Sequence, residues 1–180
     1  MISRRAVLAA AVMAAPPPSF AQQADGAPPL PPTLGALSTM PVAAPGGAAS
    51  TLGAHLRPGP AVITFWATWC SPCVAEGRRL AEWRTRIAAE RLNIIGVNLG
   101  RDRSDANLKR FMRRARMIYT QLWGTAALYR AFNNPLEGST ILLPRLYVFA
   151  ADGVPAAAFG RYEGASSLRR IDRAIEAVLA

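Results

Sequence analysis

The sequence contains few of the residues that bind metals or form structural cross-links. It has two cysteines, Cys70 and Cys73, and one histidine, His55. A structural zinc site needs about four ligands, so half a zinc site is a weak interpretation of the cysteine pair. A disulfide that closes so short a loop also adds little chain-entropy stabilisation, which disfavours an inert structural bridge. The pair therefore indicates redox chemistry, and we expect neither a metal nor a cofactor.

The N-terminal apolar stretch is too short to cross a bilayer. Residues 6–15 are apolar, whereas a spanning helix needs about 20 such residues. Ser3-Arg4-Arg5 precedes this stretch, and Ser19-Phe20-Ala21 follows it as a small-residue cleavage site. This order predicts an export signal over residues 1–21, of the general or the twin-arginine type. An uncleaved membrane anchor is the alternative, and it would be the chain's only membrane contact.

Acidic residues are scarce relative to basic ones. There are 11 acidic and 21 basic residues, a net charge of +10, and all the basic residues except Lys109 are arginine. We attribute the arginine bias to genome composition and expect no nucleic-acid partner, because an exported protein meets little DNA. The positive charge favours acidic partners or anionic lipid headgroups. Five of the residues from 109 to 116 are basic. They form either a solvated helix face or a patch that binds an acidic partner or a membrane surface.

Residues 22–49 are rich in proline, glycine and alanine and carry almost no charge. This composition predicts a flexible linker without a core of its own. A packed strand near residues 34–37 or 51–56 is the alternative. We therefore expect a signal peptide at 1–21, a linker at 22–49 and one folded domain at 50–180.

From Ala61 onward, strand patterns alternate with helix patterns. The apolar run 61–67 predicts a central strand buried on both faces. Further strands are expected at 92–97, 119–122, 146–150 and 156–161. Helices are expected over 104–116 and 125–132, and two more are expected to begin at 71 or 72 and at 166 or 167. Asp152-Gly153 predicts the turn of a hairpin. This alternation, ending in a hairpin and a helix, is typical of an α/β sandwich.

The two cysteines follow the first buried strand and open the first long helix. At a helix N-terminus, unpaired N–H groups and the helix dipole stabilise a thiolate at Cys70. Cys73 lies one turn further along and can attack a mixed disulfide formed on Cys70. We therefore expect Cys70 to be the exposed nucleophile and Cys73 the inner, resolving thiol, with Pro72 stiffening the segment between them.

Two segments carry a family resemblance. Residues 65–76, Phe-Trp-Ala-Thr-Trp-Cys-Ser-Pro-Cys-Val-Ala-Glu, resemble the active-site segment of the TlpA/ResA-type thioredoxin-like proteins. Residues 143–149, followed by Asp152-Gly153, are similar to the family's cis-proline strand and hairpin. The resemblance implies a thioredoxin-like α/β fold: a central mixed β-sheet flanked by helices, with an extra strand–helix element before the cis-proline strand. It also implies a periplasmic thiol reductant that acts in cytochrome c maturation or in oxidase copper-site assembly.

The resemblance extends to individual site residues. Glu76 matches the acidic residue near the cysteine pair, which would exchange a proton with Cys73. Pro144 matches the cis-proline, and the backbone of Leu143 would pair with a substrate strand. The chain departs from the family at Arg78, where proline is frequent, and at Arg145, where threonine is common. Arg145 would make the substrate groove more basic.

The expected partners follow from this interpretation. Trp69 would offer an apolar docking surface beside Cys70 to an exported client protein that contains a disulfide. A membrane thiol donor would then reduce the pair again. Two alternatives use the same thiols: a net oxidant of the DsbA type, and a metallochaperone that binds Cu(I) through both thiolates.

Overall fold

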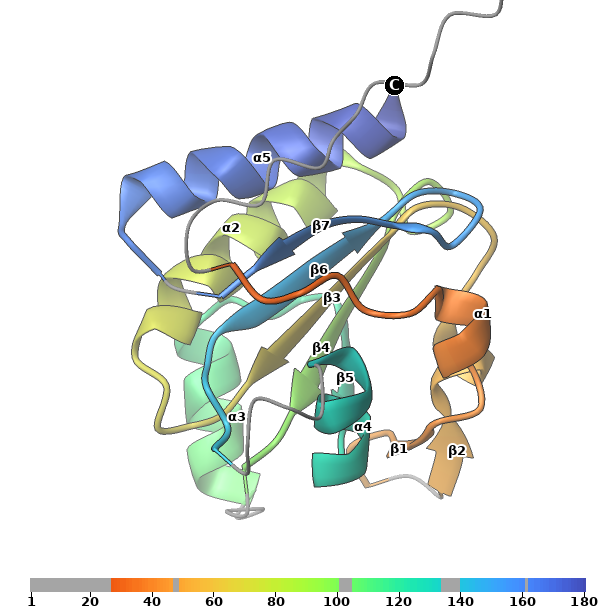
Figure 1. The fold of residues 1–180 in the computed structure, drawn as a ribbon. Helices are drawn as coiled ribbons and strands as arrows, with labels where there is room; N and C mark the ends of the chain where they lie inside the picture. The colour runs from red at the N-terminus through yellow and green to blue at the C-terminus, as the bar shows by residue number, and fades with distance from the viewer. Residues whose placement is uncertain (1–26, 47–48, 101–104, 134–139, 161) are drawn as a thin grey trace, which may run out of the picture.

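The computed structural model describes residues 27–46, 49–100, 105–133, 140–160 and 162–180. Within them, one seven-stranded sheet has the order β2-β1-β5-β4-β3-β6-β7 (Figure 1). The strands are β1 (Pro41–Ala43), β2 (Ala49–Thr51), β3 (Ala61–Trp66), β4 (Asn93–Asn98), β5 (Thr120–Trp123), β6 (Arg145–Phe149) and β7 (Pro155–Phe159). The helices are α1 (Leu34–Leu37), α2 (Pro72–Arg86), α3 (Asp105–Arg114), α4 (Ala126–Phe132) and α5 (Ala165–Leu179), with a 3-10 turn η1 (Leu52–His55).

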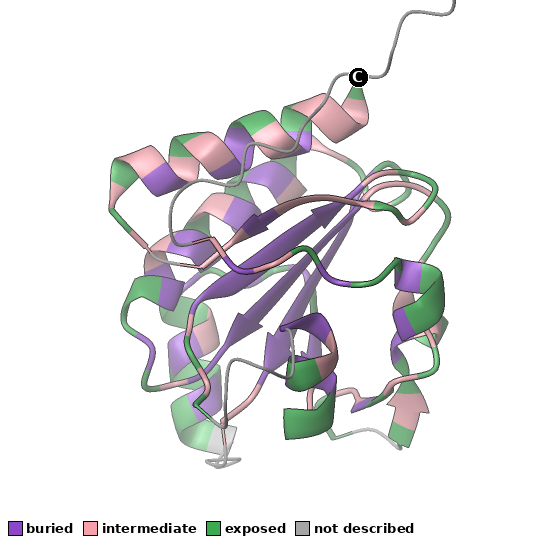
Figure 2. Ribbon diagram, in the orientation of Figure 1, coloured by how far each residue is buried: buried purple, intermediate pink, exposed green. Residues whose placement is uncertain are grey.

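The sheet is mixed, as the family resemblance implies. β3, β4 and β5 run parallel, whereas β6 pairs antiparallel with β3 and β7 antiparallel with β6. The central strands are buried at every position because helices cover both faces (Figure 2). The β5–α4 pair precedes β6, which confirms the predicted extra strand–helix element before the cis-proline strand.

Alternate side chains of each central strand enter two separate apolar cores. Trp66 and Leu146 point to the face covered by α2, α3 and α5. Phe65 and Tyr147 point to the opposite face, where α1 and α4 pack. Side chains alternate along a strand, and α2 packs on the Trp66 face, where it contributes Val74 and Leu80 to the core. The cysteine pair therefore belongs to that core.

The prediction of a linker without a core is wrong for residues 27–46. Leu34, Leu37 and Val42 are buried in the core on the α4 face. The Leu34 N–H donates to the Gly153 carbonyl at 2.9 Å, and Ala43 pairs with Trp123 of β5. A few apolar side chains thus dock on the sheet despite the surrounding proline and alanine. The packed alternative at 34–37 holds, although the segment is a helix and not a strand. Residues 1–26, including the expected signal peptide, lie outside the described residues.

Several element boundaries also differ from the expected ones. α3 ends at Arg114 because Arg116 adopts a left-handed backbone conformation, with φ of 53°. α5 begins at Ala165 after Gly164, whose φ of 74° suits glycine, so neither Ser166 nor Ser167 is the N-cap. Among the described residues, no helix combines the length and the apolar character that a membrane crossing requires.

Candidate active site

Cys70 and Cys73 form a disulfide at the start of α2, with an S–S distance of 2.05 Å. β3 ends at Trp66, and a short turn brings Cys70 to the helix N-terminus, where Pro72 occupies the first turn. Proline is tolerated there because its missing N–H would have no partner within the helix. The predicted strand–CxxC–helix arrangement is therefore present, with both sulfurs in the positive field of the helix N-terminus.

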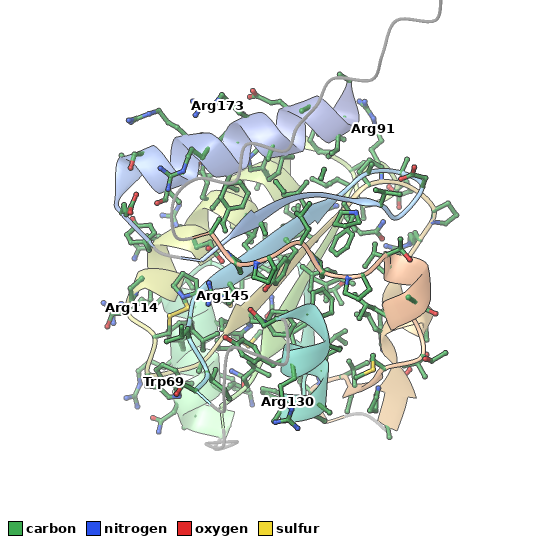
Figure 3. The ribbon with its side chains drawn as sticks, in the orientation of Figure 1. Trp69, Arg91, Arg114, Arg130, Arg145 and Arg173 are labelled. Carbon is green, nitrogen blue, oxygen red and sulfur yellow. A yellow bond between two sulfur atoms is a disulfide. The ribbon has the colours of Figure 1, made fainter. Side chains whose placement is uncertain are left out.

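The expected difference in exposure between the two cysteines is not present. Cys70 is 3% exposed and Cys73 is 2% exposed, so the prediction of an exposed Cys70 is wrong for the oxidised protein. Both side chains pack in the core that contains Trp66 and Val74. Trp69, directly before Cys70, is 63% exposed and is the prominent apolar surface beside the disulfide (Figure 3).

Glu76 is the buried acid of the site. It lies on α2, three residues after Cys73, and is only 4% exposed. Its Oε1 accepts a hydrogen bond from the hydroxyl of Thr64 on β3. Burial raises the pKa of Glu76 from 4.5 to about 7, and the Thr64 hydrogen bond lowers it in part. A carboxyl with this pKa can both take up and release a proton near neutral pH.

A row of residues crosses the sheet from Thr64, the hydrogen-bond partner of this carboxyl, and the sequence analysis missed it. Thr64, Gly96 and Gln121 lie side by side on β3, β4 and β5. Gly96 has no side chain, and a Cβ there would overlap the Gln121 amide. The Gln121 Oε1 consequently accepts a hydrogen bond from the Trp66 indole N–H at 2.9 Å. Thr64 and Gln121, both polar and both in buried strands, were the available signals.

The peptide bond between Leu143 and Pro144 is cis, as the resemblance implies. Arg145 pairs with Phe65, so Pro144 lies at the end of β3 from which the cysteine turn departs. Leu143 is half-buried and packs against both apolar cores. The strand register therefore brings the cis-proline segment and the cysteine turn to the same edge of the sheet.

α4 holds this segment through a tyrosine. The Tyr129 hydroxyl donates a hydrogen bond to the Leu142 carbonyl and accepts one from the Leu142 N–H, both at 2.9 Å. The Asn133 side chain, just after α4, accepts a hydrogen bond from the Tyr147 hydroxyl of β6 at 2.6 Å. The inserted β5–α4 element is thus tied to the strand that carries Pro144.

Arg145 does not lie where a client could reach it. Its side chain is 5% exposed, and a Cβ at Gly160 would overlap its guanidinium and approach Pro28. The expectation that Arg145 lines a basic substrate groove is therefore wrong, because the N-terminal segment and Gly160 cover it. Arg78 is exposed, and its Nε donates to the Arg114 carbonyl of α3 at 2.9 Å.

The fold and the disulfide define the class of protein: a thioredoxin-like α/β protein with a CxxC pair, whose chemistry is thiol–disulfide exchange. A family model described as the AhpC/TSA family matches residues 43–156. The chain belongs to this family.

Comparisons with individual proteins agree with this class. A thiol:disulfide interchange protein DsbE from Yersinia pestis is 41% identical over 54 residues, which is 29% of this chain and 27% of that protein. The match thus spans only about a quarter of that relative's length.

Solved structures agree with the fold. A secreted disulfide oxidoreductase of Mycobacterium tuberculosis has a TM-score of 0.61 at 22% identity, over 79% of this chain and 98% of that one. A thiol:disulfide interchange protein of Chlorobium tepidum has a TM-score of 0.62 at 23% identity, and the match covers 87% of this chain and 100% of that one. Peroxiredoxin Q of Xanthomonas campestris has a TM-score of 0.60 at 20% identity, and the match covers 86% of this chain and 99% of that one. At these identities the similarity establishes the thioredoxin-like fold.

Proposed function

We propose that this protein is an exported thiol–disulfide oxidoreductase that reduces disulfides in client proteins. The observation that carries the proposal is the Cys70–Cys73 disulfide at the N-terminus of α2, with the buried carboxyl of Glu76 one turn further along. A structural bridge would gain nothing from a helix N-terminus or from a nearby acid that titrates close to neutral pH. A redox pair uses both.

The reaction is a two-electron exchange that starts from the reduced pair. The Cys70 thiolate attacks one sulfur of the client disulfide, that S–S bond breaks, and the departing client thiolate takes up a proton. The Cys73 thiolate then attacks Sγ of Cys70, which breaks the mixed disulfide and releases the second client thiol. The client gains two electrons, and the protein is left with the Cys70–Cys73 disulfide seen in the structure.

Glu76, Pro144 and Leu143 have supporting roles in this proposal. Glu76 accepts the proton of Cys73 as that thiol becomes the attacking thiolate, and returns it when the pair is reduced again. The cis-proline segment offers the Leu143 backbone to an extended client strand beside the disulfide, in the manner of strand addition. Trp69 supplies the apolar contact next to it.

The cellular setting follows from the N-terminal sequence. An arginine pair, an apolar stretch and a small-residue site favour export to the periplasm. An oxidising compartment returns the pair to the disulfide, so a membrane dithiol donor must reduce it for each turnover. The secreted disulfide oxidoreductase of M. tuberculosis, a structural neighbour, supports an exported setting. Clients in cytochrome c maturation or oxidase copper-site assembly fit this setting.

The test is reduction of insulin by the purified protein with dithiothreitol as donor. We expect turnover for the wild type, none for Cys70→Ser, and a stable mixed disulfide with the client for Cys73→Ser. The reduction potential should lie near the thioredoxin value of about −270 mV. Undiminished turnover in Cys70→Ser would remove the mechanism, and a potential near about −120 mV would reverse its direction.

A further inference from the structure

A groove lies directly beside the residue that precedes Cys70. It has a volume of about 320 Å³, and one wall comes from the cysteine turn while the other comes from α3. Its lining residues are Thr68, Trp69, Asn107, Arg110, Phe111 and Arg114. Figure 3 shows Trp69 and Arg114 on the same side of the molecule as the disulfide.

The apolar part of the groove is firmly built. Phe111 is buried and stacks on Trp66, with ring centroids 4.9 Å apart and planes 6° apart. Trp69 stands beside it with most of its surface free. A fixed aromatic floor next to an exposed tryptophan is a favourable anchor for a polypeptide, because tryptophan is enriched among residues that dominate binding energy.

The charged residues of the groove are both basic. Arg110 and Arg114 are exposed and one helical turn apart, and neither forms an ion pair among the described residues. The sequence has no aspartate or glutamate from 106 to 136. In residues 101–105 the formal charges of two arginines and two aspartates sum to zero. The Arg78 side chain holds the backbone of Arg114 in place. In the part of the chain that the structure describes, no ion pair neutralises Arg110 or Arg114, so the groove is positively charged.

We propose that this groove binds an acidic segment of the client, next to the client disulfide. The inference rests on the proposed function and specifies its substrate class: disulfides flanked by aspartate or glutamate. Client carboxylates would form charge-assisted hydrogen bonds with Arg110 and Arg114, and an apolar client side chain would pack on Trp69. Since Trp69 adjoins Cys70, binding there holds the client sulfur close to the attacking thiol. A bilayer pressed on this face would instead cover the disulfide, which favours a polypeptide occupant.

The experiment measures selectivity among disulfide peptides. The reduced protein is mixed by stopped flow with peptides of equal length whose disulfide is flanked by glutamates, by glutamines or by lysines. We expect the glutamate peptide to react about tenfold faster than the glutamine peptide at low ionic strength, and the lysine peptide to react slowest. The preference should shrink in about 0.5 M salt, where charges are screened within a few ångströms.

A matched pair of variants locates the preference. Arg110→Gln/Arg114→Gln should bring the glutamate-to-glutamine rate ratio close to one. Arg91→Gln/Arg173→Gln removes the same charge from exposed positions that lie away from Trp69 and the disulfide (Figure 3), and should keep the ratio. If the rate ratio fell equally in both double variants, the preference for glutamate would come from the net charge of the protein, and the groove proposal would be wrong.

Two further outcomes separate this inference from the proposed function. If all three peptides are reduced at the same rate, the groove proposal fails and the reductase stands. If none of the peptides is reduced, and the small neutral compound hydroxyethyl disulfide is not reduced either, the proposed function itself fails. Binding to phosphatidylglycerol vesicles that is lost in Arg110→Gln/Arg114→Gln, without any peptide preference, would assign the groove to the membrane surface and overturn the proposal.

Discussion

The hydroxyl of Thr64 donates a hydrogen bond to the carboxyl of Glu76, and both side chains are buried. The bond joins β3 to α2 close behind the cysteine pair. Two effects of opposite sign therefore act on the pKa of Glu76: burial raises it and the Thr64 hydrogen bond lowers it. Burial is the larger effect, and it leaves the carboxyl titrating near the pH at which thiols exchange.

Replacing Thr64 with valine should raise the pKa of Glu76 above its value of about 7, because the lowering contribution is lost while burial remains. The measurement is a carbon-13 NMR titration of the Glu76 carboxyl in the oxidised protein, where neither cysteine titrates. Thr120→Val, at an exposed position of β5, is the control and should leave the titration unchanged. An unchanged Glu76 titration in Thr64→Val would show that this bond does not act on the carboxyl.

Burial of Glu76 should make the protein less stable as pH rises. Between its unfolded pKa of 4.5 and its folded pKa of about 7, the folded state keeps a proton that the unfolded chain has lost. The free energy of unfolding should therefore fall by about 2 to 3 kcal/mol from about pH 5 to about pH 8 and level off above that.

Urea denaturation at a series of pH values measures this change, with Glu76→Gln as the comparison. The glutamine variant carries no titrating group at this position and should show a much flatter profile. The explanation would be wrong if both proteins lost stability equally with pH.

Removing the Tyr129 hydroxyl should loosen the segment before Pro144. Tyr129→Phe loses both hydrogen bonds to Leu142. Because Leu142 is exposed and water can replace these bonds, we expect a cost of only about 1 kcal/mol in stability. We expect a higher KM for insulin with little change in kcat, and faster hydrogen exchange at the Leu142 N–H. Tyr162→Phe is the control, and equal effects in both variants would argue against a positioning role.

Adding a methyl group at Gly96 should displace the Gln121 amide that it would overlap. We expect Gly96→Ala to lose about 1 to 3 kcal/mol of stability and to alter Trp66 fluorescence, because Gln121 accepts the Trp66 N–H. The double variant Gly96→Ala/Gln121→Ala removes the overlap, so its loss should be smaller than the sum of the two single losses. Additive losses in chemical denaturation would show that the two sites are independent.

Much of the active-site segment was predictable because its signals are local. A run of apolar, β-branched and aromatic residues, followed after two further residues by Cys-Ser-Pro-Cys, indicates a buried strand that leads into a helix. Each of these signals depends on near neighbours in the chain. Pro144 was identifiable by resemblance alone, since an isolated X–Pro bond is usually trans. Residues 27–46 were misassigned because their composition resembles a linker, and the burial of Leu34 depends on a sheet assembled from later residues.

The sequence by itself determined the redox pair, its place at the start of a helix and the excess of basic residues, because spacing and charge are properties of the chain alone. Only the tertiary structure decided which neighbours these residues meet. It buried Cys70 and Arg145, set Thr64 against Glu76, and brought Arg110 and Arg114 beside Trp69. Those contacts join segments far apart in the sequence, and the packing of helices on both faces of the sheet determines them.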